Sequence, residues 1–320
     1  MAGIALPSYK DNLLSLVGAA TGELGLTVPA SVVGNSDTTA TLFLYLANRV
    51  GQEVYQSATK NGGWQVLRKQ NQFTITSSGN ITGTFTSGSP TITAVSNTAN
   101  VGVGMQVVSY GFINYPTTVL SKTSNTITMS ANATATSPAA TTFYCGNDAY
   151  SLPTDFAFFI AQTFWDGNFR WQLLGPLEAQ EWAVLKFGIS PTGPRRRFRV
   201  FNNLFYIDPV PNDNGSLIAY EYYSAYWAQS IGGASGTPQS SFLADTDNFL
   251  LDDDVMIHGL KWRYKQRAGL DYSQEKEDYD LALQRIMSRD GGTRNLPLNA
   301  SASGVRLLNN QNTPDTGFGS

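Results

Sequence analysis

A long uncharged block limits how this chain can fold more than any other feature. Between Ser78 and Thr141 the only charged residue is Lys122, whereas charges occur at ordinary density in the rest of the 320 residues. Such a block is a disordered linker, a membrane segment or a separately folded β-module. No run of 18 apolar residues occurs in the sequence, so we expect no membrane-spanning helix.

The residue pattern of the block favours the β-module. Disordered linkers are poor in β-branched and aliphatic residues, but here such residues alternate with polar ones in short runs. Turn-forming Gly, Ser, Asn and Pro separate the runs at intervals of about ten residues, as in small β-sandwiches and barrels. The runs are Thr91–Val95, Gln106–Val108, Thr117–Leu120 and Thr126–Met129.

The remaining sequence predicts helices toward both ends and strands between them. In the second predicted helix, apolar residues recur on one face at Phe43, Leu46, Ala47, Val50 and Val54. The segment Arg195–Tyr223 predicts a three-stranded meander with turns at Asn202-Asn203 and Asn214-Gly215. The predicted helices are Ser8–Thr21, Thr38 to about Ala58, Pro176–Lys186, about Asp252–Ala268 and about Ser273–Arg289.

Composition excludes several classes of protein. The net charge of −3 and the pI of about 5.2 provide no overall positive field to hold nucleic acid. A single cysteine, Cys145, rules out an intramolecular disulfide, and a single histidine, His258, argues against a Cys/His zinc site. The first residues lack the basic and apolar regions of a signal peptide.

Few residues could carry catalysis. Cys145 and His258 could pair as nucleophile and base, but a buried strand cysteine and a helical histidine explain them more simply. Glu178 and Glu181 could act as paired carboxylates, although such pairs are common on helix surfaces. Asp252–Asp254 could hold a cation, but acidic residues at a helix start usually complement the helix dipole. We therefore predict no catalytic, cofactor-binding or metal-binding residue, and no cofactor.

One basic cluster stands out, at Arg195, Arg196, Arg197 and Arg199. Arginines could contact DNA phosphates or an acidic protein. Because Phe198 and Val200 alternate with two of the arginines, the cluster also fits a strand with one arginine-bearing face. If the cluster does bind a partner, the sequence favours a protein over DNA.

Several segments, in order along the chain, resemble the head-to-tail connector adaptors of tailed phages, the family that includes tail tubular protein A. The most specific of them is FLADTDNFLLDDDVMIHGLKWRYKQRAGLDY (Phe242–Tyr272). The others are NGGWQVLRKQNQFTI (Asn61–Ile75), SLPTDFAFFI (Ser151–Ile160), GPLEAQEW (Gly175–Trp182) and EYYSAYW (Glu221–Trp227).

The resemblance implies an α+β fold with a helical-bundle core and a small antiparallel β-sheet region. The adaptor core would comprise residues 1–77 and 143–290, and residues 78–142 would form an inserted all-β sandwich or barrel domain. Residues 291–320 would form an extended C-terminal arm that binds the portal. The arm's candidate contact residues are Arg294, Leu296, Leu298, Val305, Arg306, Leu307, Leu308 and Phe318.

The resemblance also implies a structural, non-enzymatic role in the virion, at the head–tail junction, after synthesis in the host cytoplasm. Such adaptors form a ring, usually twelvefold, between the portal protein and the next tail or nozzle protein. DNA passes through the ring during genome ejection without specific binding. The inserted domain, which is similar to small β-modules of phage structural proteins, would decorate the rim or anchor a tail fibre.

Two other functions fit parts of the sequence. A virion-associated cell-wall hydrolase would use Glu178 or Glu181 as its acid. A carbohydrate-binding tail component would recognise host glycans through residues 78–142.

Overall fold

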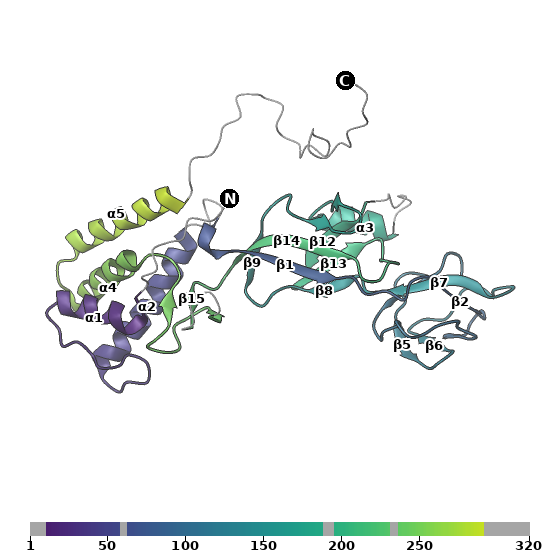
Figure 1. The fold of residues 1–320 in the computed structure, drawn as a ribbon, viewed down its shortest axis with the longest axis horizontal. Coiled ribbons are helices and arrows are strands. Elements are labelled where there is room, and N and C mark those ends of the chain that lie inside the picture. The colour runs from purple at the N-terminus through teal and green to yellow at the C-terminus, as the bar shows by residue number, and fades with distance from the viewer. Residues whose placement is uncertain (1–10, 58–62, 188–194, 231–235, 291–320) are drawn as a thin grey trace, which may run out of the picture.

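The computed structural model describes residues 11–57, 63–187, 195–230 and 236–290. Figure 1 shows an elongated molecule, with helices α1, α2, α4 and α5 at one end and strands in the middle and at the other end. The helices are α1 (Leu13–Glu23), α2 (Thr38–Ser57), α3 (Ala179–Phe187), α4 (Asp253–Ala268) and α5 (Ser273–Asp290), with a 3-10 helix at Gln65–Leu67.

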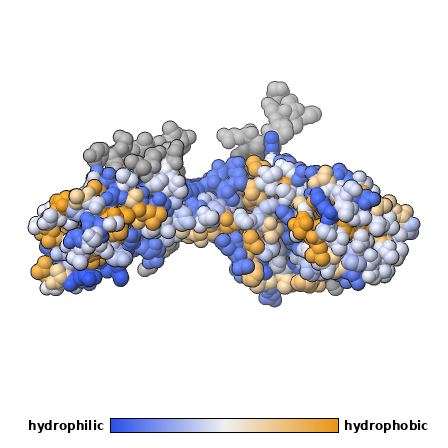
Figure 2. Space-filling model, turned by 90° about the horizontal axis from the view of Figure 1, so that it is seen from below, coloured by the Kyte–Doolittle hydropathy of each residue, from blue (hydrophilic) through white to orange (hydrophobic). Residues whose placement is uncertain are grey.

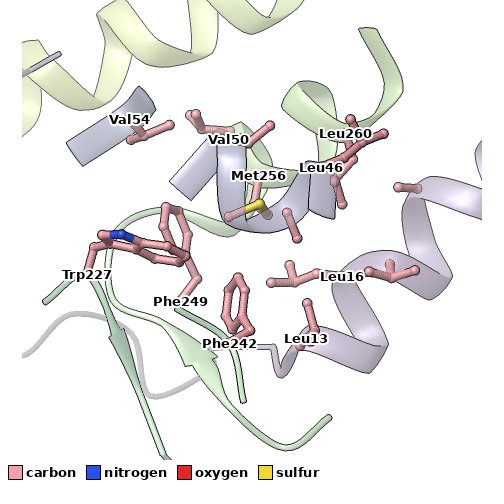
Figure 3. Close-up of a cluster of buried hydrophobic side chains, with 14 of the residues drawn as sticks. Leu13, Leu16, Leu46, Val50, Val54, Trp227, Phe242, Phe249, Met256 and Leu260 are labelled. Carbon is pink, nitrogen blue, oxygen red and sulfur yellow. The ribbon is translucent and has the colours of Figure 1, made fainter. Parts of the chain in front are cut away.

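The helical end is built around aromatic side chains from outside the helices. Trp227, Phe242 and Phe249 are nearly or fully buried against α1, α2 and α4 (Figure 3). Gly51 of α2 makes room for Trp227, because a Cβ atom on Gly51 would lie 2.4 Å from the indole ring. A small sheet carries two of these aromatics. Its strands are β15 (Ala228–Gln229), β16 (Pro238–Gln239) and β17 (Asn248–Phe249). Phe249 lies in β17, and Trp227 directly precedes β15.

Two antiparallel sheets form the middle of the molecule. They pack through an aromatic cluster, in which the rings of Phe205 and Tyr220 stack at 5.7 Å. One sheet has β1 (Arg68–Thr74), β14 (Leu217–Ser224), β10 (Trp165–Asp166) and β11 (Trp171–Gln172) in that order, and β9 (Phe156–Phe159) also pairs with β14. The other has the order β12 (Arg197–Phe201), β13 (Leu204–Asp208) and β8 (Ala149–Ser151).

The uncharged block forms two further antiparallel sheets around its own apolar cluster, which contains Phe85, Ile127 and Phe143. All four runs that the sequence predicts as strands contain one. Cys145 is buried at the end of this cluster, as its sequence context suggests. The strands are β2 (Ile81–Gly83), β3 (Thr91–Ile92), β4 (Gln106–Val108), β5 (Val119–Lys122), β6 (Ile127–Met129) and β7 (Thr141–Gly146).

A buried ion pair joins α3 to the middle sheets beside this block. Lys186 Nζ lies 2.7 Å from Asp208 Oδ1, and both side chains are at most 7% exposed. The ammonium also lies 4.7 Å from the ring centroid of Tyr115, which belongs to the uncharged block. The pair therefore sits where helix, sheet and block meet.

Asp148 is also buried near this pair, and it allows a prediction of how the free energy of unfolding depends on pH. Burial raises the pKa of Asp148, an effect that the nearby Lys186 charge only partly offsets. A carboxyl whose pKa is raised by folding binds protons more tightly in the folded state, so its ionisation reduces stability as pH increases.

We therefore expect Asp148→Asn to increase the free energy of unfolding at neutral pH and to have little effect at a pH below the carboxyl's ordinary pKa. Chemical unfolding of both proteins across this pH range measures the difference. Asp271→Asn provides the control, because hydrogen bonds from Ser273 lower the pKa of this exposed carboxyl. A stability difference for Asp148→Asn that grows toward acid pH would contradict the expectation.

The prediction of a helical-bundle core is wrong. Most elements of the described residues are short strands in several small antiparallel sheets, and five α-helices accompany them. Helical periodicity shows that a helix has an apolar face, but not what covers that face. Here Trp227, Phe242 and Phe249, from outside the helices, share one buried cluster with the helical faces, while Phe- and Tyr-rich strands bury a separate core in the middle.

The predicted three-stranded meander is also only partly correct. β12 and β13 form the expected hairpin, with positive φ at Asn202 and Asn203 in its turn. β14, however, leaves this sheet and pairs with β1, β9 and β10. The proline-containing connection Asp208–Gly215 therefore joins two sheets, although Asn214-Gly215 resembles a hairpin turn.

Candidate protein-binding site

Strand β12 displays the basic cluster by simple alternation. Phe198 is fully buried and Val200 packs against the same core. Because successive side chains of a strand point to opposite faces, Arg197, Arg199 and Phe201 occupy the outer face. Phe201 is 57% exposed, and the Arg199 guanidinium lies 4.9 Å from its ring centroid.

Helix α3 covers only part of this outer face. Its Trp182 ring contacts Tyr206 of β13, but none of its nine residues is fully buried. Val184 is 51% exposed and Phe187 75% exposed, although the Phe187 ring lies 6.1 Å from the Tyr115 ring. The helix therefore has an apolar side that the described part of the chain does not cover.

A groove of about 360 Å³ separates α3 from β12. Leu177, Val184 and Leu185 supply its apolar wall, and its polar lining consists of Arg197 together with Gln180 and Glu181 of α3. We call the groove, together with Arg199 and Phe201, the arginine groove. Exposed aliphatic and aromatic side chains beside arginine are typical of protein interfaces.

The four arginines of the cluster do not have the same role. Arg196 is bonded to Asp166 and Asp213 and lies over the Phe169 ring, so it holds the structure together. Burial opposes ionisation of Asp213, but hydrogen bonds from Arg196 and Ser216 lower its pKa overall.

Arg195, Arg197 and Arg199 differ from Arg196. Among the described residues, no carboxylate lies within ion-pair distance of these three side chains. They remain available to the carboxylates of a partner.

A second hollow, of about 150 Å³, lies beside the β10–β11 hairpin. Phe169 and Trp171 of this hairpin are 53% and 41% exposed, with ring centroids 6.0 Å apart. The sequence indicates their exposure only weakly, through the Asp166-Gly167 turn that lies beside these two aromatic residues. The apolar side of α3 has none, because its alternation with polar residues fits an ordinary surface helix.

The structure does not bring the candidate catalytic residues together. Cys145 lies on β7 and His258 on α4, at opposite ends of the molecule (Figure 1). Glu178 and Glu181 are both exposed, and Glu181 accepts a hydrogen bond from the Glu178 backbone N–H at 3.3 Å.

The acidic helix start is also occupied by local interactions. Asp252 caps α4 by accepting from Asp254 N, and it forms an ion pair with Arg289 at 2.6 Å. Within the described ranges, no three His, Cys, Asp or Glu side chains are grouped so that they could hold a metal ion.

The predicted portal-binding arm, with Arg294, Leu296, Leu298, Val305, Arg306, Leu307, Leu308 and Phe318, lies outside the described residues. Among the helices that are described, none has the length and apolar character needed to cross a bilayer.

Neither the models of known protein families nor the curated proteins match the sequence.

Proposed function

We propose that this chain is a structural connector adaptor of a tailed phage. Copies of it form a ring, about twelvefold, between the portal protein and the next tail protein, and DNA passes through the ring without specific binding. The proposal assigns no catalytic step and no cofactor. It places the protein at the head–tail junction of the virion, with residues 78–142 available to a tail fibre on the rim.

The observation that carries the proposal is the arginine groove, supported by the ordered resemblance to connector adaptors. Arg197 and Arg199, without carboxylate partners in the described chain, border exposed apolar side chains. This combination fits an acidic protein surface with apolar residues. No comparable feature of the described residues supports the hydrolase or glycan-binding alternatives.

Native mass measurement tests the function directly. The purified protein is measured alone and mixed with the portal ring of its own phage. We expect several equal copies to load onto each portal ring. If micromolar protein does not associate with the portal, the adaptor assignment is wrong.

The arginine groove should serve the next tail protein, because the C-terminal arm is assigned to the portal. We expect Arg197→Glu combined with Arg199→Glu to weaken association with the tail protein about tenfold or more, since like charges then face each other. Loading onto the portal should continue. Titration of the tail protein against portal-bound adaptor measures the effect.

Arg285→Glu is the matched control, because Arg285 is an exposed arginine of α5, far from the groove. Truncation before Gly291 should have the reverse effect and abolish portal loading. If the double arginine variant instead prevents portal loading, the division of roles between groove and arm is wrong.

A further inference from the structure

Strand β1 has one open edge. It pairs with β14 in regular register over seven consecutive residues, and no other described strand pairs with it. β1 also has no fully buried residue. Figure 2 shows a hydrophilic waist where β1 and β14 connect the two ends of the molecule. The open edge thus lies on an accessible, narrow part of the surface.

The backbone groups at this edge follow from the ladder. Ile75 N donates to Ser216 O at 2.7 Å, which makes this a hydrogen-bonded pair. Hydrogen-bonded and non-bonded pairs alternate in antiparallel strands. The N–H and C=O groups of Gln70, Gln72 and Thr74 therefore point away from β14, toward the open edge.

The side chains of β1 do not guard this edge. Lysine, proline and bulges normally protect open strands from pairing with other chains. β1 has no proline or bulge. Its two cations are paired within the chain instead, Arg68 with Glu221 on the exposed face of β14 and Lys69 with Asp155 at 2.6 Å.

The same sheet has a second open edge, at β9. Ile160 N donates to Glu221 O at 3.1 Å. By the same alternation, the N–H and C=O groups of Phe159 face away from β14, and a register shift between Tyr223 and Ser224 ends the regular ladder beyond Phe158. No described strand pairs with β9 on that side. Within the described residues, one chain therefore has two unpaired edges on opposite sides of one sheet.

We propose that β1 of one copy pairs with β9 of the next copy, so that the sheet continues from chain to chain. β1 and β9 are both antiparallel to β14, so they run parallel to each other. A neighbour that keeps the same strand direction brings its β9 to β1 as a parallel pair. Such a head-to-tail contact uses two different surfaces, and it forms a ring when the rotation between neighbouring copies closes. The inference rests on the proposed ring function.

The size of this contact explains when it would form. A strand pair limited by the four residues of β9 is small beside the ~1,200–2,000 Å² that stable interfaces bury. Free copies should therefore pair only briefly, so that they are mostly monomeric unless concentrated. Binding side by side on a portal ring raises their effective concentration and allows the edges to pair.

Proline at Gln72 tests the backbone contact. Gln72→Pro removes an N–H that points away from β14, so the fold should tolerate it, as edge strands tolerate proline. We expect it to reduce loading of multiple copies onto the portal about tenfold, whereas Gln72→Ala, which keeps the N–H, should load normally. If the two variants load equally, the edge does not pair.

Disulfide trapping tests the partner strand in the free protein. Gln72 and Phe158 face the same side of the sheet, because their partners on β14, Ala219 and Tyr223, are an even number of residues apart. Concentrated Gln72→Cys and Phe158→Cys proteins, mixed and mildly oxidised, should form a mixed disulfide, which mass spectrometry of the linked peptides identifies. The native Cys145 is buried, and burial raises its pKa to about 12, so it should not compete.

The control replaces Phe158→Cys with Tyr45→Cys, an exposed position on α2, and should give only background cross-linking. A dominant disulfide between two Gln72→Cys copies would show twofold pairing and overturn the proposal, as would the absence of a specific mixed disulfide. Trapping without portal binding would support the edge contact and reject the connector function. Portal loading without trapping, and without an effect of proline, would support the connector function and reject the edge contact.

Discussion

Lys186→Ala should destabilise the protein by about 3–5 kcal/mol, because it leaves a buried carboxylate without its counter-charge. Lys186 and Asp208 are almost fully buried, so solvent cannot replace the lost partner. The second oxygen of Asp208 has no hydrogen-bond partner within the described residues, which leaves it no alternative. Chemical unfolding followed by circular dichroism measures the loss.

Lys276→Ala is the matched control. Lys276 forms an ion pair with Asp280 on the surface of α5, where both side chains are more than a third exposed. Such a pair contributes only about 0.3–0.5 kcal/mol. If the two alanine variants lose similar amounts of stability, the buried pair stabilises the fold no more than the exposed pair does. Lys186→Met combined with Asp208→Asn should recover most of the loss, because no unpaired charge then remains at Asp208.

Trp227→Ala should cost about 3–5 kcal/mol at the helical end, as expected for a large aromatic residue removed from a core. The indole is fully buried between Gly51, Phe242 and Phe249 (Figure 3), and its Nε1–H donates to Gln52 at 3.3 Å. Because Trp227 follows β14 and packs on α2, its removal should also loosen the connection between sheet and helices. The denaturant midpoint of the helical circular-dichroism signal measures this.

Tyr45→Ala serves as the control, since Tyr45 is an aromatic residue of α2 that is 70% exposed. It should change stability by less than about 0.5 kcal/mol. Trp227→Phe should give an intermediate loss, because it keeps most of the apolar contact but not the hydrogen bond. Equal midpoints for Trp227→Ala and Tyr45→Ala would exclude the assigned role of Trp227.

Local structure could be predicted well where a short-range signal determines it. Asp37 accepts from Ala40 N at 3.1 Å at the start of α2, as expected of a helix N-cap, and the apolar face from Phe43 to Val54 is buried. Asn202-Asn203 forms the expected turn of the β12–β13 hairpin. In these cases, neighbouring residues alone fix the backbone or the buried face.

Long-range pairing could not be predicted in this way. Nothing near β14 in the sequence indicates that its partner is β1, almost 150 residues away, because both strands fit many registers. The helical-bundle prediction failed for the same reason, since the partners of the helices include Trp227 and Phe242. At the arginine groove, alternation predicts the outward Arg197 and Arg199, but the uncovered side of α3 becomes visible only in three dimensions.

The chain enters the uncharged block after β1 of one middle sheet and leaves it toward β8 of the other, at almost the same point. Ser77 and Gly146 form a bridge, and Ser78 N donates to Cys145 O at 2.7 Å. The two junctions are therefore one hydrogen bond apart, and a short turn could join them. In genetic terms the block is a cassette: its coding segment could be lost, or exchanged for another, without requiring a longer path anywhere else in the chain.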